Sequence, residues 1–148
     1  MLKIISKCTT GKIKSIFTCS ILSDGTIRNF PDSITVSDFL NRTVMNHQNT
    51  LIKSSLFFEH GFYNEELQMK SDYEFFLKEL WKYRSIFAHV KTNIAVYDVN
   101  GISSQNSPER SAEHIIALRN IFQELAEFII EPYYGKRKLS SNDLLQYY

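Results

Sequence analysis

The sequence predicts an α/β protein, in which short strands and helices share one chain and a long helix lies near the C-terminus. Three observations predict this class. A β-branched and aromatic run at 15–22 precedes the turn pair Asp24-Gly25, a helix with one apolar face begins near Ser71, and apolar residues recur every three or four positions over 107–132. With 148 residues, 43% of them hydrophobic, the chain can bury one substantial core.

The first predicted element is a β-hairpin. The run 15–22 forms its first strand, Asp24-Gly25 tolerates the positive φ of a tight turn, and 26–30 forms its second strand. Pro31 cannot donate to a strand ladder, so the hairpin ends there. The apolar spacing over 33–41 then predicts a short connecting helix.

A short strand and a short helix follow. Residues 49–53 predict the strand, and His47 and Gln48 stand at its entrance. Ser55 is the predicted N-cap of a helical turn over 56–60, and Gly61 is its predicted C-cap.

The strongest local signal is the start of the next helix. Ser71 and Glu74 have the spacing of a capping box, which places Asp72 in the first helical turn. The predicted apolar face of this helix is Tyr73, Phe76, Leu77, Leu80 and Trp81.

The last third of the chain predicts strand and then helix. Segments 85–90 and 93–97 indicate two strands or one bent strand, closed by the turn pair Asn100-Gly101. Ser107 as N-cap and Pro108 at the first position open a long helix that reaches Pro132. Its apolar stripe is Ile115, Leu118, Phe122, Leu125 and Ile129. We therefore expect one domain over 1–132 and a basic, tyrosine-rich tail over 133–148.

Composition excludes some functions and suggests a location. Lysine and arginine number 17 against 16 acidic residues, so no broad positive field favours nucleic acid. Cys8 and Cys19 match neither a metal motif nor a disulfide framework, which indicates a reducing compartment. The apolar start, 1–5, is too short for a signal peptide, so a cytoplasmic location is expected.

Four sequence blocks carry a family resemblance. They are a His-Gln pair before a strand, a glycine-aromatic segment ending in an acidic turn, a Ser-Asp-Tyr-Glu-Phe helix start, and a glycine loop, at 47–53, 61–67, 71–77 and 101–104. In this order they resemble family 2 glycosyltransferases of the GT-A type. The family loop reads Gly-Gly-Ile-Ser, and here Asn100 replaces its first glycine. Asparagine tolerates left-handed backbone, so the turn can be kept.

The resemblance implies the C-terminal, acceptor-side half of a GT-A fold, a small mixed sheet packed by helices. It implies sugar transfer from a nucleotide-sugar donor to a saccharide or lipid-linked acceptor, in polysaccharide or glycoconjugate synthesis. By the same resemblance Asp72 is the catalytic base. The implied substrate-binding residues are His47, Gln48, Gly101, Ser103 and Ser104.

Each of these residues also has a purely structural interpretation. Acidic residues such as Asp72 are common in first helical turns because they suit the helix dipole. His47 can be an ordinary strand-end histidine, and Ser103 and Ser104 can simply cap a turn or contact solvent. Glu74 lies two positions from Asp72 on another helix face, so the pair does not form a metal motif.

Parts of a complete transferase are missing from the sequence. A divalent cation, manganese or magnesium, is expected for the complete enzyme, yet the chain has no Asp-x-Asp to hold it. Residues 1–14 are too few for the nucleotide-binding half, and Thr9-Thr10-Gly11-Lys12 does not fit a phosphate loop. We therefore expect little activity from the chain alone, and its expected partners are a separate N-terminal half or a second copy.

Two other functions stay open. In one, the stripe over 115–129 pairs with another chain, and the protein is a non-catalytic interaction module. In the other, the basic run Lys136-Arg137-Lys138 and the neighbouring tyrosines of the tail dock on a membrane surface.

Overall fold

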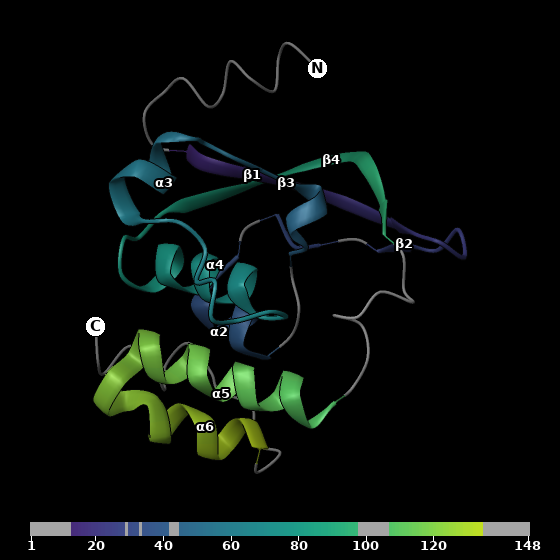
Figure 1. The fold of residues 1–148 in the computed structure, drawn as a ribbon. Coiled ribbons are helices and arrows are strands. Elements are labelled where there is room, and N and C mark those ends of the chain that lie inside the picture. Colours follow the sequence, from purple (N-terminus) through teal and green to yellow (C-terminus); the bar gives the residue numbers. More distant parts are fainter. Residues whose placement is uncertain (1–12, 29, 33, 42–44, 98–106, 135–148) are drawn as a thin grey trace. The chain divides into compact units, whose positions relative to one another are not determined.

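The computed structural model describes residues 13–28, 30–32, 34–41, 45–97 and 107–134, drawn as coloured ribbon in Figure 1. The chain divides into two compact units. The first unit comprises Met1–Ile34, Val44–Phe62 and Arg84–Gly101, and the second comprises Thr35–Thr43, Tyr63–Tyr83 and Ile102–Tyr148. The chain therefore passes between the units several times.

The first unit is built on a four-stranded mixed sheet around β1 (Ile13–Leu22). β2 (Ile27–Arg28) and β3 (Thr50–Ile52) pair with β1 in antiparallel orientation. The predicted hairpin is confirmed. Its turn has Gly25 at φ 84°, and the amide of Thr26 donates to Asp24 Oδ1 at 2.8 Å.

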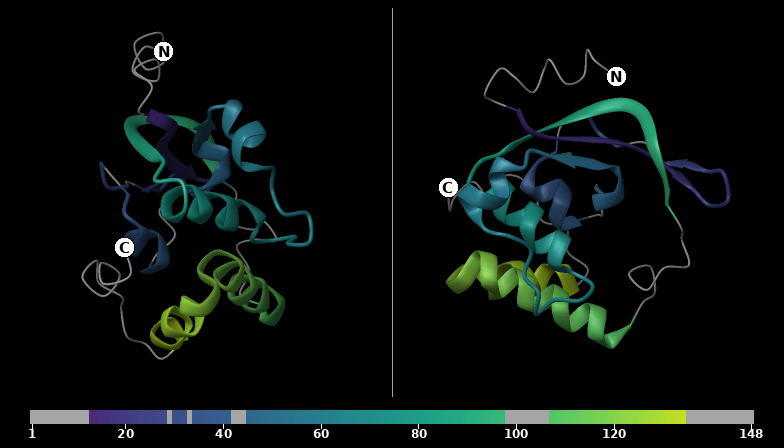
Figure 2. Two further views of the ribbon diagram at one scale, coloured as in Figure 1. Left: turned by 90° about the vertical axis from the view of Figure 1, so that its left-hand side faces the viewer. Right: turned by 45° about the horizontal axis from the view of Figure 1, so that its top comes forward.

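β4 (Ile86–Tyr97) completes the sheet by pairing with β1 in parallel orientation. The two strand segments predicted at 85–90 and 93–97 are one strand, whose register shifts between the pairs Thr18↔Val90 and Cys19↔Asn93. Such an irregularity bends a strand, and Figure 2 shows β4 as a curved ribbon.

Two short helices flank β3 in the first unit. The 3-10 helix η1 (His47–Asn49) precedes it, and α3 (Ser55–His60) follows it. α3 has Ser54, one residue earlier than predicted, at its N-cap position. It ends at Gly61, as predicted, with φ 89° and ψ 161°. Large buried side chains of this unit are Phe17, Met45, Leu56 and Phe87.

The second unit contains the helices α2 (Val36–Asn41), α4 (Ser71–Trp81), α5 (Pro108–Phe122) and α6 (Ala126–Tyr134). The predicted connecting helix is α2. Thr35 Oγ1 accepts from the Asp38 amide at 3.1 Å, and Asp38 Oδ2 accepts from the Thr35 amide at 3.2 Å. This reciprocal pair is a capping box that the sequence analysis missed.

The predicted long C-terminal helix is present as α5 but ends earlier than expected. Ser107 Oγ accepts from the Arg110 amide at 3.1 Å and Pro108 follows the cap, as predicted. The helix stops at Phe122, because Gln123 has φ 51° and ψ −116°. The 3-10 turn η3 (Gln123–Leu125) then leads into α6, which passes through Pro132.

The apolar stripe of α5 and α6 belongs to the core. Leu118 is 0% exposed, Phe122 4% and Ile129 1%. They are buried together with Phe75, Phe76 and Leu77 of α4. The expected boundary between residues 132 and 133 lies inside α6, and residues 135–148 of the expected tail lie outside the described part. Among the described helices none is long and apolar enough to cross a membrane.

Candidate active site at the start of helix α4

Asp72 lies in the first turn of α4, as predicted, and the residue is partly buried. Asp72 Oδ1 accepts a hydrogen bond from the amide of Tyr73 at 2.7 Å. The residue is thus neither sealed in the core nor fully in water. Such a position is open to a side chain that contacts a ligand.

The capping box predicted for this helix is not formed, and that prediction was wrong. Lys70, not Ser71, stands at the N-cap position, and it makes no side-chain cap hydrogen bond. Glu74 is buried and instead accepts from Asn120 Nδ2 of α5 at 2.7 Å. The local pattern predicted a bond from Glu74 to the start of its own helix. A hydrogen bond to Asn120 of another helix is found instead.

The amides before α4 are held by another residue of α5. Glu113 Oε1 accepts from the amide of Gln68 at 3.1 Å. Glu113 Oε2 accepts from the amides of Met69 at 2.7 Å and Lys70 at 3.0 Å. A carboxylate that takes several backbone hydrogen bonds forms a strong anchor, so α5 fixes the segment that leads into Asp72.

Lys70 brings a buried positive charge to the same place. The residue is 8% exposed, and its Nζ lies 5.1 Å from the centre of the Tyr73 ring. Burial, followed by the nearby charge of Arg110, lowers the pKa of Lys70 to about 8, while the charges of Asp72 and Glu113 act in the opposite direction. At neutral pH the ammonium is still the main form.

Tyr63 contributes a phenol that senses the charge of Asp72. Burial raises its pKa, and the negative charge of Asp72 raises it further. Its ring packs edge-on against Phe75 with the centres 5.2 Å apart. The hydroxyl therefore remains protonated near neutral pH and can act as a hydrogen-bond donor.

His114 lies near Lys70 and Tyr73, although the sequence assigned it no role. The residue is 6% exposed, and its ring centre is 4.6 Å from that of Tyr73. Burial and the charges of Lys70 and Arg110 lower the pKa of His114 to about 3. The imidazole is therefore neutral at pH 7. No local sequence pattern signals this, because the burial comes from packing between helices.

The candidate site thus combines a carboxylate, an ammonium, a phenol and a neutral imidazole within the second unit. We call these residues, Tyr63, Lys70, Asp72 and His114, the Asp72 cluster. It holds a base and hydrogen-bond donors of the kind that bind and deprotonate a hydroxyl group.

The predicted residues His47 and Gln48 belong to the first unit. Both lie on η1 and are exposed. η1 is fixed on both sides: Thr50 Oγ1 donates to the carbonyl of Asn46 at 2.8 Å, and Thr18 Oγ1 donates to the carbonyl of Asn49 at 3.2 Å. The turn therefore presents both side chains on the surface. Gly101, Ser103 and Ser104 lie outside the described residues.

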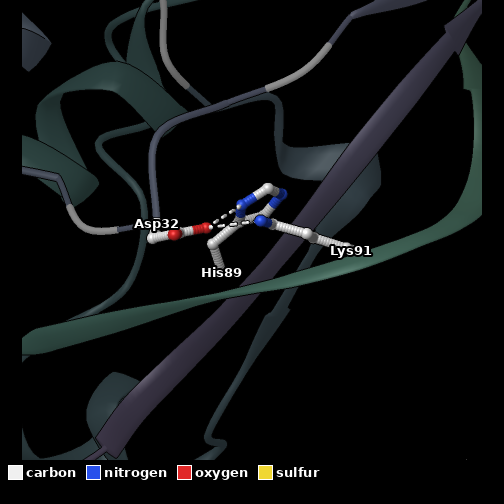
Figure 3. A network of polar contacts seen from close by, with 3 residues as sticks. All are labelled: Asp32, His89 and Lys91. Carbon is white, nitrogen blue, oxygen red and sulfur yellow. Dashed lines mark ion pairs between the residues drawn. The ribbon is translucent and has the colours of Figure 1, made fainter.

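A second histidine cluster lies in the first unit and is drawn in Figure 3. Asp32 Oδ1 lies 3.7 Å from His89 Nδ1 and 3.4 Å from Lys91 Nζ. The His89 ring stacks on Phe17 with centres 4.9 Å apart. Because the side chains of Asp32 and Lys91 are 79% and 76% exposed, their ion pair contributes little to stability. We assign this cluster a packing role.

The divalent cation expected for a complete transferase finds no ligand set in the described part of the chain. No group of three or more histidine, cysteine, aspartate or glutamate side chains is arranged there to hold a metal ion. The Asp72 cluster offers a carboxylate, an ammonium, a phenol and a neutral imidazole.

Neither the protein-family models nor the curated protein sequences that were compared with this sequence match it.

Proposed function

We propose that the chain is the acceptor-side part of a family 2, GT-A type glycosyltransferase, with Asp72 as the base. The four blocks of the sequence suggest the family. The observation that carries the proposal is the partly buried Asp72 in the first turn of α4, with Lys70 and Tyr63 in the same cluster.

In the proposed reaction the acceptor hydroxyl loses its proton to a carboxylate oxygen of Asp72. The acceptor oxygen bonds to the anomeric carbon of the sugar, the bond from that carbon to the diphosphate oxygen breaks, and the nucleoside diphosphate leaves with the electron pair. The acceptor hydroxyl becomes acidic only as the new bond forms, so Asp72 acts late in the step.

Other residues have supporting roles in this proposal. The Tyr63 phenol donates a hydrogen bond to a sugar oxygen, and the Lys70 ammonium adds positive charge close to the base. His47 and Gln48, which η1 presents on the surface, contact donor or acceptor, and Gly101, Ser103 and Ser104 complete the donor side. The nucleotide and a divalent cation, manganese or magnesium, are held by a separate N-terminal half.

The proposed location is cytoplasmic, with the tail beyond α6 docking on a membrane surface that carries a lipid-linked acceptor. The alternative of an interaction module requires the stripe of α5 and α6 to face another chain. Leu118 and Ile129 are buried within this chain, so no observation favours that alternative.

The test of the base compares Asp72→Asn with the parent chain, each joined to an upstream nucleotide-binding half. Sugar transfer is measured with manganese and a saccharide acceptor. Removing a general base costs about 10²- to 10⁴-fold in rate, so we expect a loss of that size. The control is Glu124→Gln, which neutralises an exposed carboxylate outside the cluster and outside the four sequence blocks. Equal rates for Asp72→Asn and the parent would remove Asp72 from the mechanism.

A further inference from the structure

A single side chain of α5 holds three consecutive amides that lead into α4. Both oxygens of Glu113 are engaged, at 3.1 Å to Gln68, 2.7 Å to Met69 and 3.0 Å to Lys70. Hydrogen bonds to an ionised acceptor are shorter and stronger than neutral ones. Glu113 therefore fixes the backbone direction of residues 68–70.

Apart from Glu113, no side-chain cap at the N-cap position of α4 supports this segment. Lys70 gives no side-chain cap, and Glu74 is engaged by Asn120. Asp72 follows the last anchored amide by two residues. A change in the direction of residues 68–70 therefore moves the Asp72 carboxylate relative to Tyr63.

We propose that Glu113 is the positioning residue of the Asp72 cluster: by anchoring the amides of residues 68–70, it holds the Asp72 carboxylate beside Tyr63. The importance of this role for sugar transfer rests on the proposed function. The positioning itself can be measured in the chain without any substrate, because Tyr63 reports on Asp72.

The reporter is the titration of the Tyr63 phenol. Burial raises its pKa, and the Asp72 charge raises it further. Moving or neutralising the Asp72 carboxylate removes the second contribution and leaves much of the first. The pKa of Tyr63 therefore distinguishes a held carboxylate from a displaced one.

The experiment titrates carbon-13-labelled tyrosine in the full chain by NMR. It compares the parent with Glu113→Gln, Asp72→Asn and the double variant. We expect each single change to lower the pKa of Tyr63, and the double variant to lower it no further than Asp72→Asn alone. The matched control is Glu109→Gln, on the first turn of the same helix and exposed, which we expect to leave the pKa of Tyr63 unchanged.

A further variant distinguishes the position of the residue 113 carboxylate from its charge. Glu113→Asp keeps the negative charge on a side chain one methylene shorter, so it loses part of the reach to the three amides. We expect it to lower the pKa of Tyr63 as well, and the exchange of the Met69 and Lys70 amides to become about tenfold faster or more. Amides of Phe76 and Leu118, both buried, show in the same samples whether the unit remains folded.

Three results would overturn the proposal. They are an unchanged pKa of Tyr63 in both Glu113 variants, additive lowering in the double variant, and parent-like titration of Glu113→Asp beside a lowered value in Glu113→Gln. Additivity would mean that Glu113 acts on Tyr63 by its own charge. A joined enzyme that transfers no sugar would end the proposed function instead, and would leave this titration unaffected.

Discussion

Gly61 has a backbone conformation that is essentially confined to glycine. Its φ of 89° and ψ of 161° place a Cβ in steric conflict with the neighbouring backbone. Gly25 also has a positive φ, of 84°, but it lies in an open turn where an added Cβ would meet nothing within 4 Å. The two glycines therefore differ in how far another residue can replace them.

We predict that Gly61→Ala lowers the free energy of unfolding by about 1–3 kcal/mol, the usual cost of such backbone strain. Gly25→Asn is the control, since asparagine tolerates left-handed backbone, and it should cost clearly less. Urea unfolding followed by circular dichroism measures both. Equal losses for the two variants would show that the conformation of Gly61 carries no special strain.

Single residues of the candidate site differ in how far sequence can predict them. The first-turn position of Asp72 and the terminating role of Gly61 follow from local patterns, and both are found. Lys70 and His114 carry no local signal. Both are charged or polar side chains that become buried only when helices distant in the sequence pack together.

Among the helices, two segments carry the same capping pattern and only one uses it. Thr35 and Asp38 form the reciprocal bonds at the start of α2. Ser71 and Glu74 have the same spacing, but Asn120 engages Glu74. Local capping bonds contribute about 1 kcal/mol, so a part-buried tertiary hydrogen bond can replace them.

We predict that Thr35→Ala destabilises the protein by about 1 kcal/mol, because it removes a working helix cap. The matched change Ser71→Ala removes a hydroxyl that caps nothing, and its effect should stay within about 0.5 kcal/mol. Thermal unfolding of the two variants side by side gives the comparison. A larger loss for Ser71→Ala than for Thr35→Ala would contradict the assigned caps.

The order of the helices and strands along the chain could be predicted better than which strands pair with each other. The hairpin of β1 and β2 depends on residues close in sequence, and the pair Asp24-Gly25 predicts it. The parallel pairing of β4 with β1 depends on residues far apart, and no local pattern encodes it. The break after α5 was also hidden, because the apolar spacing continues past Gln123 while glutamine gives no signal of positive φ.

For the molecule as a whole, His114 makes stability depend on pH. Its pKa is lowered from 6.5 to about 3 in the folded protein by burial and by the charges of Lys70 and Arg110. Between these values the unfolded chain binds more protons than the folded one, so stability falls as the pH is lowered. The loss begins near pH 6.5 and continues toward pH 3.

We predict that acidification from about pH 6.5 to about pH 5.0 costs the parent up to about 2 kcal/mol through this histidine, since each pH unit is worth about 1.36 kcal/mol. His114→Gln, which does not titrate, should lack that part of the loss. Urea unfolding at the two pH values measures the difference. The same acid sensitivity in both proteins would assign it to other groups.

The parallel pairing of β1 with β4 also determines the order in which the chain can fold. Ile13 pairs with Ile86, about 70 positions later, and closing so distant a contact is slow. During synthesis β1 can meet β2 and β3 as they emerge, while residues 63–83, which belong to the second unit, must still be made. Until β4 arrives, one edge of β1 stays open to strands of neighbouring nascent chains, which makes this interval the step most exposed to aggregation.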